Sequence, residues 1–400
     1  PPSPKYIEDD AVDAAQHDSI SDCTICASGK YSYAGYKTCV NCKAGTFLTD
    51  NGATIANHDS IDDCNVCTSG QWSGAGATVC TGCAAGTFIT DNGDKKHHHD
   101  AISDCQVCKK GQWSDVGSQT CTKCVAGKFL FELGIESVGH NSIDKCVICP
   151  AGKWALEDAD KCEVCPAGMY LDDDGASASN HVSISSCKVC AKGKWALEGT
   201  KLCHNCDAGR YLADDASDAS KHDEHNDCQV CSSGMHAEDV SNHECTNCEA
   251  GRYLIDHAQN ETLHDVSSID CIICSAGQHS ESGATECIAC ASGKYLTDDG
   301  ENADAHDAIS DCTICAVGQW SSISAAVCVD CAAGRYIGDA GADASKHDSI
   351  LDCTICASGQ YSHKGSAACI NCDAGKYIVD DGNDVTKHNK IEDCKVCRYG

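Results

Sequence analysis

The stretch Cys23–Cys42 reads CTICASGKYSYAGYKTCVNC and contains two C-x2-C pairs separated by twelve residues. Zinc is bound by four ligands in a tetrahedron, and two such pairs supply four thiolates. The same spacing also fits half of a ladder of disulfide bonds. The choice between zinc and disulfides decides whether the protein belongs inside or outside the cell.

Cysteine dominates the composition, with 38 cysteines among 400 residues, a level that indicates a disulfide scaffold. Leu, Ile, Val and Phe together make up only about 15% of the residues, and the formal net charge is −31. A chain this polar cannot bury enough apolar surface to offset its conformational entropy, so cross-links must hold it.

The acidic charge argues against a nucleic-acid partner, because phosphate is repelled. The sequence has no run of about 18 apolar residues for a membrane span and no visible signal peptide, so we expect any secretory signal to lie outside this stretch or to have been removed.

The cysteines recur with a period of 41 residues, in the pattern C-x2-C-x12-C-x2-C-x21. Only the step from Cys228 to Cys271 is longer, at 43 residues, because both loops of that repeat have one additional residue. A fixed period predicts a linear array in which each repeat contacts mainly its neighbours. We therefore divide the chain into an incomplete N-terminal unit (1–22), nine repeats, and the start of a further repeat (394–400). The nine repeats are 23–63, 64–104, 105–145, 146–186, 187–227, 228–270, 271–311, 312–352 and 353–393.

Each repeat consists of two related halves, and each half contains the pattern C-x-x-G-x-aromatic (His236 and His279 replace the first aromatic in repeats 6 and 7). The recurring glycines indicate a positive φ or a close approach of two backbones. Asn-Gly and Asp-Gly pairs in the long loops indicate tight turns. We expect the aromatic rings to pack on the adjacent disulfides; the alternative is a stack that binds a ligand. The predicted fold class is small and disulfide-rich: a linear tandem array with short β-hairpins and almost no helix.

Disulfides explain this composition better than zinc. Nine zinc sites in a strongly acidic chain have no evident nucleic-acid partner, whereas each disulfide closes a loop and contributes about 3 kcal/mol. The sequon Asn260-Glu261-Thr262 lies in a lengthened loop of repeat 6 and predicts an N-glycan at Asn260. We therefore interpret the opening stretch as part of a disulfide ladder.

The string CTICASGKYSYAGYKTCVNCKAGTF, residues 23–47, resembles the ephrin-receptor-like cysteine-rich repeat, a relative of the tumour-necrosis-factor-receptor-like modules. The pattern CxxCxxGxY…CxxCxAGxY covers essentially the whole chain. The resemblance implies rod-like, secreted, disulfide-stapled arrays within large extracellular proteins of protists and algae, including surface hairs of the mastigoneme type. This chain departs from the receptor members in its regularity, because they usually mix unequal modules.

The pattern alone leaves the connectivity open, since four cysteines allow three pairings inside one repeat. The resemblance implies a ladder in which the second cysteine pairs with the third and the fourth with the first of the next repeat. The rival pairs Cys23 with Cys39 and Cys26 with Cys42. The first rungs of the ladder, paired in the order written, are formed by Cys26, Cys39, Cys42, Cys64, Cys67, Cys80, Cys83 and Cys105.

A histidine also recurs, six residues before the first cysteine of each repeat and seven before it at Cys271. We expect these side chains to bond within their own loop or to pack at the junction between repeats. The alternatives are calcium or transition-metal binding with nearby aspartates, and a pH-responsive contact. These histidines are His17, His58, His99, His140, His181, His222, His264, His306, His347 and His388.

The acidic turns Asp172–Asp174 and Asp298–Asp299 carry oxygen ligands suited to calcium. They lack the twelve-residue loop that makes such a site specific, so we expect solvated turns. His97–His99 is expected to be a surface cluster. We therefore predict no cofactor and no metal site.

The expected function is structural. No nucleophile–base pair, phosphate-binding loop or paired acid motif recurs, so we expect no enzyme. Identical faces repeated every 41 residues suit self-association, because one contact is reused along the chain. We expect an extracellular filament, hair or matrix subunit that binds copies of itself and other matrix proteins. The alternative is a ligand-binding or adhesive ectodomain, for which the repeat that starts at Cys228 is the one candidate site.

The ends of the chain also fit the repeat. Lys5-Tyr6 aligns with Lys294-Tyr295. Under the ladder, Cys23 and Cys397 lack partners within this stretch. We expect the native polypeptide to continue past Gly400, with the partner of Cys397 roughly thirteen residues downstream, and Cys23 to pair outside the stretch. A bond between Cys397 and Cys23 of another copy is the alternative.

Overall fold

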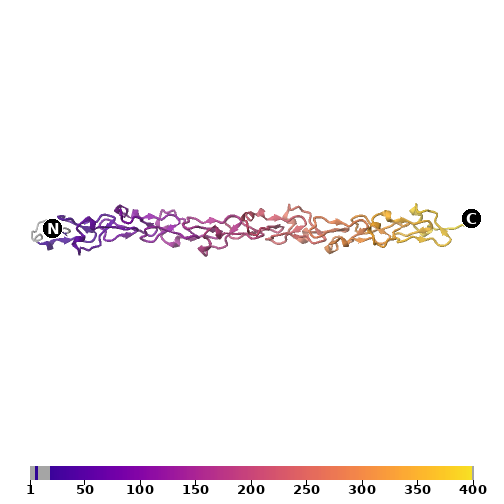
Figure 1. The fold of residues 1–400 in the computed structure, drawn as a ribbon, viewed down its shortest axis with the longest axis horizontal. Coiled ribbons are helices and arrows are strands. Elements are labelled where there is room, and N and C mark those ends of the chain that lie inside the picture. The colour runs from indigo at the N-terminus through magenta and orange to yellow at the C-terminus, as the bar shows by residue number, and fades with distance from the viewer. Residues whose placement is uncertain (1–4, 8–18, 399–400) are drawn as a thin grey trace. The chain divides into compact units, whose positions relative to one another are not determined.

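The protein is described by a computed structural model, in which residues 5–7 and 19–398 are placed (Figure 1). The chain divides into two compact halves, Pro1–Val189 with Ala196–Cys203 and Cys190–Trp195 with His204–Gly400. Within each half, short antiparallel hairpins follow one another in chain order. The predicted fold class is confirmed: 18 disulfides form a regular ladder through repeats of about 41 residues, with many two-stranded hairpins and almost no helix. The predicted positions His17 and Gly400 lie outside the described residues.

One kind of hairpin joins the second and third cysteine of a repeat, and each of its strands has two residues. In the first of them, Tyr31 is opposite Val40. The residue before the second cysteine is β-branched and ends the preceding strand. The next glycine, Gly29, takes a positive φ of 77° and turns the chain into the hairpin. The strand pairs are β3 (Lys30–Tyr31) with β4 (Val40–Asn41), β7 (Gln71–Trp72) with β8 (Thr81–Gly82), β11 (Gln112–Trp113) with β12 (Thr122–Lys123), β15 (Lys153–Trp154) with β16 (Glu163–Val164), β19 (Lys194–Trp195) with β20 (His204–Asn205), β23 (Met235–His236) with β24 (Thr246–Asn247), β27 (Gln278–His279) with β28 (Ile288–Ala289), β31 (Gln319–Trp320) with β32 (Val329–Asp330), and β35 (Gln360–Tyr361) with β36 (Ile370–Asn371).

The other kind of hairpin has a long loop and joins one repeat to the next. Its first strand follows the fourth cysteine, and its second strand follows the first cysteine of the next repeat. Lys5-Tyr6 occupies the place of Lys294-Tyr295, as the alignment predicts. The strand pairs are β1 (Lys5–Tyr6) with β2 (Thr24–Ile25), β5 (Thr46–Phe47) with β6 (Asn65–Val66), β9 (Thr87–Phe88) with β10 (Gln106–Val107), β13 (Lys128–Phe129) with β14 (Val147–Ile148), β17 (Met169–Tyr170) with β18 (Lys188–Val189), β21 (Arg210–Tyr211) with β22 (Gln229–Val230), β25 (Arg252–Tyr253) with β26 (Ile272–Ile273), β29 (Lys294–Tyr295) with β30 (Thr313–Ile314), β33 (Arg335–Tyr336) with β34 (Thr354–Ile355), and β37 (Lys376–Tyr377) with β38 (Lys395–Val396).

Single turns of 3-10 helix, which the sequence analysis does not anticipate, interrupt most long loops. The turn before Cys64 begins with a capping box, in which the Ser60 side chain accepts a bond from Asp62 N–H and Ser60 N–H donates to Asp63. The turns before a first cysteine are η2 (Ile20–Asp22), η4 (Ile61–Asp63), η6 (Ile102–Asp104), η8 (Ile143–Lys145), η10 (Ile184–Ser186), η12 (His225–Asp227), η15 (Ile309–Asp311), η17 (Ile350–Asp352) and η19 (Ile391–Asp393). The turns at the recurring histidine are η3 (Ile55–Asn57), η5 (Lys96–His98), η7 (Ser137–His140), η9 (Ala178–Asn180), η11 (Ala219–Lys221), η13 (Glu261–Leu263), η14 (Ala303–Ala305), η16 (Ala344–Lys346) and η18 (Val385–Lys387).

The lengthened loop of repeat 6 contains α1 (Ser267–Asp270), a single α-helical turn at the place that a 3-10 turn takes elsewhere. The additional residue lets Asp270 N–H reach the Val266 carbonyl oxygen, four residues back. No helix in the described part of the chain is both long and apolar enough to cross a membrane.

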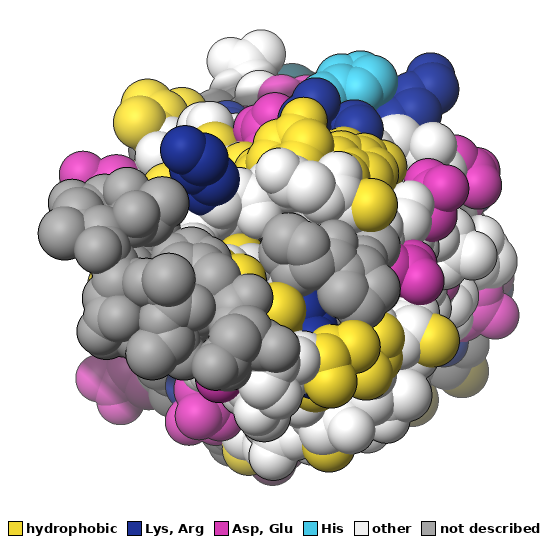
Figure 2. Space-filling view, turned by 90° about the vertical axis from the view of Figure 1, so that its left-hand side faces the viewer, with side chains coloured by type: hydrophobic (Ala, Val, Ile, Leu, Met, Phe, Trp, Pro, Cys, Tyr) yellow, Lys and Arg dark blue, Asp and Glu magenta, His cyan; other side chains and the backbone are white. Residues whose placement is uncertain are grey.

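The core is divided among the repeats. In repeat 4, for example, Cys165, Leu171 and Cys187 form one buried cluster against which Trp154 packs. Acidic side chains lie around the side of the molecule seen in Figure 2, with hydrophobic side chains exposed between them. Because each cluster is small, covalent links and hydrogen bonds must carry much of the stability.

Candidate functional site: the junction between repeats

Disulfide bonds cross every junction that the ladder predicts. Cys26 bonds to Cys39 inside repeat 1, and Cys42 bonds to Cys64 of repeat 2, with Cα–Cα distances of 5.8 and 5.7 Å. The next two rungs join Cys67 to Cys80 and Cys83 to Cys105. Cys23 and Cys397 are the free cysteines of the described chain, the first buried and the second exposed. The rival pairing within one repeat is therefore not the one formed.

Backbone hydrogen bonds reinforce each covalent junction. Gly45 N–H donates to the Ser73 carbonyl oxygen at 2.9 Å, and Gly76 N–H donates to the Cys42 carbonyl oxygen at 2.8 Å. A Cβ atom on Gly45 would lie 2.0 Å from the Lys96 carbonyl oxygen. The glycine after the fourth cysteine is therefore required by the close approach of the next repeat as well as by its φ of 84°.

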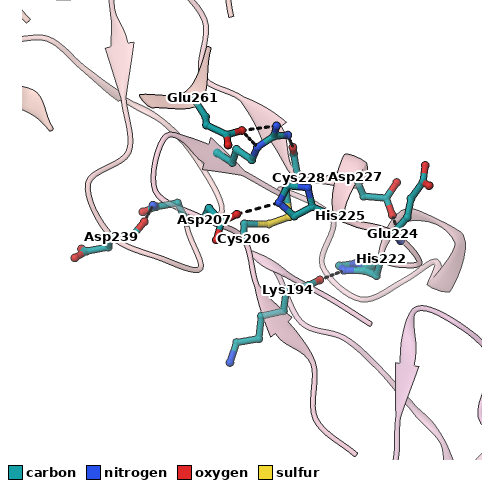
Figure 3. The surroundings of a disulfide bond; sticks show 12 residues. Lys194, Cys206, Asp207, His222, Glu224, His225, Asp227, Cys228, Asp239 and Glu261 are labelled. Atoms are coloured by element: carbon teal, nitrogen blue, oxygen red, sulfur yellow. Dashed lines mark hydrogen bonds and ion pairs between the residues drawn. A yellow bond between two sulfur atoms is a disulfide. The ribbon is translucent and has the colours of Figure 1, made fainter. Parts of the chain in front are cut away.

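The recurring histidine is fully buried between the long loop and the short hairpin of its own repeat. His58 and its eight described counterparts in repeats 2 to 9 have no exposed surface. The Nδ1 atom of His58 lies 2.7 Å from the Lys30 carbonyl oxygen, and its backbone carbonyl accepts a bond from Ser32 N–H. Figure 3 shows the same contact between His222 and Lys194, close to the Cys206–Cys228 disulfide. The histidine thus ties the long loop to the short hairpin of the same repeat, a contact that the sequence analysis does not name.

The other ring nitrogen faces an aspartate eight residues earlier in the chain. His58 Nε2 lies 2.9 Å from Asp50 Oδ1. A carbonyl oxygen can only accept, so Nδ1 is the donor on its side. A second proton is then needed between Nε2 and the carboxylate, and with that proton on the ring the two groups form an ion pair. The aspartates in this position are Asp50, Asp91, Asp173, Asp214, Asp256, Asp298, Asp339 and Asp380.

Hydrogen bonds to these carboxylates favour their charged form. The bond from His58, with further bonds from Asn57 and from backbone N–H groups, lowers the pKa of Asp50 well below its ordinary value. The bond from Asn180, followed by that from His181, does the same to the pKa of Asp173. Each aspartate therefore stays ionised where it holds its histidine.

Repeat 3 lacks this pair. Glu132 stands where the other eight repeats have aspartate, and His140 Nε2 is buried without a hydrogen-bond partner. The longer glutamate stem instead lies against Gly139, where an added Cβ would come within 2.6 Å of Glu132 Cγ. The bond from His140 Nδ1 to the Gln112 carbonyl oxygen is kept at 2.7 Å. The bond from the histidine to a backbone carbonyl oxygen is thus common to all nine repeats, whereas the bond to a carboxylate is missing in repeat 3.

The aromatic after the second cysteine covers the disulfide that crosses the junction, as expected. Trp195 packs against the cluster of Cys206, Leu212 and Cys228. In repeats 6 and 7 this position is taken by His236 and His279, which are buried with Nδ1 unpaired. The smaller imidazole leaves these two junctions without the indole cover that repeats 3, 4, 5 and 8 have.

The acidic turns border open hollows. One of them measures about 620 Å³ and is lined by Asp172, Asp173 and Asp174. Asp173 uses its oxygens for Gly175 N–H, Asn180 and His181, so the loop itself occupies the ligands that calcium needs. Among the residues described, no group of three or more His, Cys, Asp or Glu side chains could hold a metal. His97–His99 is split, because His99 is fully buried while His98 lies at the surface.

The sequon of repeat 6 is accessible. Asn260 is exposed and caps η13, its side-chain oxygen accepting bonds from Thr262 N–H and Thr262 Oγ1. The hydroxyl that glycosylation requires is therefore already beside the asparagine.

Two features of the junction escape the sequence analysis, although both recur in the sequence. The aspartate lies eight residues before each histidine, and a buried aliphatic side chain, Leu48 in repeat 1, follows the aromatic of the long hairpin. A search for residues at a constant distance from the histidine finds the first.

No family model matches the chain in comparisons with known proteins, and no curated protein matches it either. The chain is a tandem array of disulfide-bonded cysteine-rich repeats with short hairpins.

Proposed function

We propose that the chain is a structural subunit of an extracellular filament, hair or matrix. The observation that carries this proposal is the junction: the same disulfide, backbone bonds and buried histidine recur from repeat to repeat. A covalent bond at each boundary, such as Cys42–Cys64, resists separation of neighbouring repeats under tension. A filament subunit under tension needs this mechanical property.

The proposal includes a secreted location and an N-glycan at Asn260. Disulfides persist in oxidising compartments, and 36 of the 38 cysteines are disulfide-bonded. The finer family assignment, an ephrin-receptor-like or tumour-necrosis-factor-receptor-like array of the mastigoneme type, rests on the resemblance of residues 23–47. We propose no catalytic role for this chain.

The second candidate is a ligand-binding or adhesive ectodomain. The irregular repeat 6, with its two insertions and the turn α1, favours it, because a receptor carries its site where its repeats differ.

Electron microscopy of native material separates the two functions. Long uniform fibres built from this chain support the structural subunit. Isolated particles of single-chain size, without fibres, contradict it and favour the ectodomain.

A further inference from the structure

Repeat 3 differs from the other repeats in its long loop, which exposes apolar side chains. The exposed fractions of Phe131, Leu133, Ile135 and Val138 are 62, 65, 77 and 63%. At the position of Leu133 no other repeat has an aliphatic residue larger than alanine. The residues there are Asn51, Asn92, Asp174, Asp215, His257, Asp299, Ala340 and Asp381. Exposed apolar side chains gathered in one place mark an interaction surface.

The apolar loop borders a hollow. It measures about 420 Å³ and is lined by Ile135 and Val138 of the loop together with Ile102 and Val107 before it. The Lys110 ammonium lies 4.9 Å from the centre of the Phe131 ring and 3.6 Å from Asp160 Oδ2 of repeat 4, so an ion-paired cation stands beside the apolar residues. We call the surface of Lys110, Phe131, Leu133, Ile135 and Val138 the repeat 3 face.

The charge of repeat 3 is also exceptional. With histidine counted as neutral, repeat 3 has five lysines against four acidic residues and a net charge of +1, whereas every other full repeat is negative. Repeats 6 and 7 are the most acidic, and each has one basic residue against eight acidic residues and a net charge of −7.

Repeats 6 and 7 expose apolar residues of their own. Ile255 and Ile269 of the first have exposed fractions of 62 and 73%, and Ile272 and Ile288 of the second have exposed fractions of 52 and 55%. Acidic residues of the long loop of repeat 7, such as Glu301 and Asp304, are also exposed. Repeats 6 and 7 therefore combine exposed apolar side chains with strong negative charge, and both complement the repeat 3 face.

We propose that the repeat 3 face of one copy docks on repeats 6 and 7 of a second copy; this inference rests on the proposed filament function. Contact between repeats 6 and 7 of two copies places repeats of −7 against each other. Contact with repeat 3 instead places the most negative repeats against the positive one. The two surfaces differ, and the proposed contact is non-reciprocal, so each copy keeps one surface free and the contact propagates into a filament. A reciprocal pair, in which each copy docks on the other through both surfaces, closes as a dimer and contradicts the proposal.

The test measures self-association of the full oxidised chain by sedimentation velocity over a range of protein and salt concentrations. Leu133→Asp with Ile135→Asp removes the apolar face and adds negative charge at exposed positions. The matched control is Leu351→Asp with Val379→Asp, at exposed fractions of 84 and 83% in repeats 8 and 9. The same disulfide content by intact mass and an unchanged far-UV CD spectrum confirm that each variant folds.

We expect the wild-type chain to associate, the repeat 3 variant to associate at least about tenfold more weakly, and the control to match the wild type. Association of the wild type is expected to weaken with salt, because opposite charges are screened. Glu301→Lys with Asp304→Lys reverses charge on the opposing surface and is expected to weaken association, whereas Asp348→Lys with Glu392→Lys is its control.

Three results overturn the inference. If the repeat 3 variant associates as tightly as the wild type, another surface is used and the filament function stands. If each control weakens association as much as its test variant, the effect is one of general charge or polarity, with the same consequence. If the wild type stays monomeric at every concentration and native material shows no fibres, the inference and the proposed function both fail.

Discussion

Repeats 3 and 4 share one junction and differ in one loop. In both, the glycine after the fourth cysteine donates across the junction, at 2.8 Å from Gly127 and 2.7 Å from Gly168. In both, the buried histidine lies 2.7 Å from a carbonyl oxygen of the short hairpin. Only repeat 4 adds the carboxylate, because Asp173 bonds His181 while Glu132 leaves His140 Nε2 unpaired. The ladder and the carbonyl bond are therefore sufficient to form the junction, and the loop beyond them is free to diverge.

The largest effect is expected from removing the disulfides, which repeats 3 and 4 share. Full reduction of the disulfides is expected to unfold repeats 3 and 4 alike, since each rung contributes about 3 kcal/mol and each apolar cluster is small. Loss of the far-UV CD signature and expansion of the hydrodynamic radius check this expectation. An unchanged spectrum and radius after complete reduction, verified by thiol counting, would show that hydrogen bonds and packing hold the fold without the ladder.

The variants His181→Ala and His140→Ala in the full chain separate the contribution of the bond to the carbonyl oxygen from that of the bond to the aspartate. Both changes delete a fully buried side chain and its bond to a carbonyl oxygen, so both are expected to cost about 2–4 kcal/mol locally. His181→Ala also leaves Asp173 without its partner and is therefore expected to cost more than His140→Ala.

Hydrogen exchange reads the two junctions separately. Ala155 N–H donates to the carbonyl oxygen of His181, and Ser114 N–H donates to that of His140, so each amide reports the opening of its own loop. Equal losses of protection in the two variants would mean that the aspartate contributes nothing to the junction.

The shared part of this comparison is also the part that the sequence predicts. The period, the hairpins and the positive φ at Gly29 and Gly45 all follow from residues that recur at constant spacing. The partners in each disulfide do not follow from spacing alone, because four cysteines per repeat leave several pairings open, and the ladder came from the resemblance. The structure decides for the ladder.

The contacts and turns of the long loops are harder to predict. The aspartate partner of the histidine lies eight residues away within an irregular loop, to which the period of a helix or a strand does not apply, so only the folded loop shows why it recurs. The 3-10 turns carry a capping signal, as at Ser60 and Asp63, but it is too short to distinguish from an ordinary turn. The apolar loop of repeat 3 is visible in the sequence as Leu133, Ile135 and Val138. Its meaning depends on their exposure, which the sequence alone does not give.

The smallest expected effect concerns acid, and it again contrasts the two repeats. Hydrogen bonds from Asn180, His181 and two backbone N–H groups lower the pKa of Asp173 in the folded chain below its ordinary value of 3.8. A carboxyl group with a lowered folded pKa stabilises the fold fully above its unfolded pKa, and this stabilisation is lost as the pH falls toward the folded value. Between about pH 5 and about pH 2, the protection of Ala155 N–H, corrected for intrinsic exchange, is therefore expected to fall more than that of Ser114 N–H. Repeat 3 lacks the pair, so Ser114 is the internal control for every other acid effect on the chain.

The variant Asp173→Asn removes the titrating group, and in this variant the pH dependence of Ala155 protection is expected to match that of Ser114. If Ala155 and Ser114 lose protection in parallel in the wild type, the carboxylate does not stabilise the junction, and repeats 3 and 4 differ only in the surface that their loops expose.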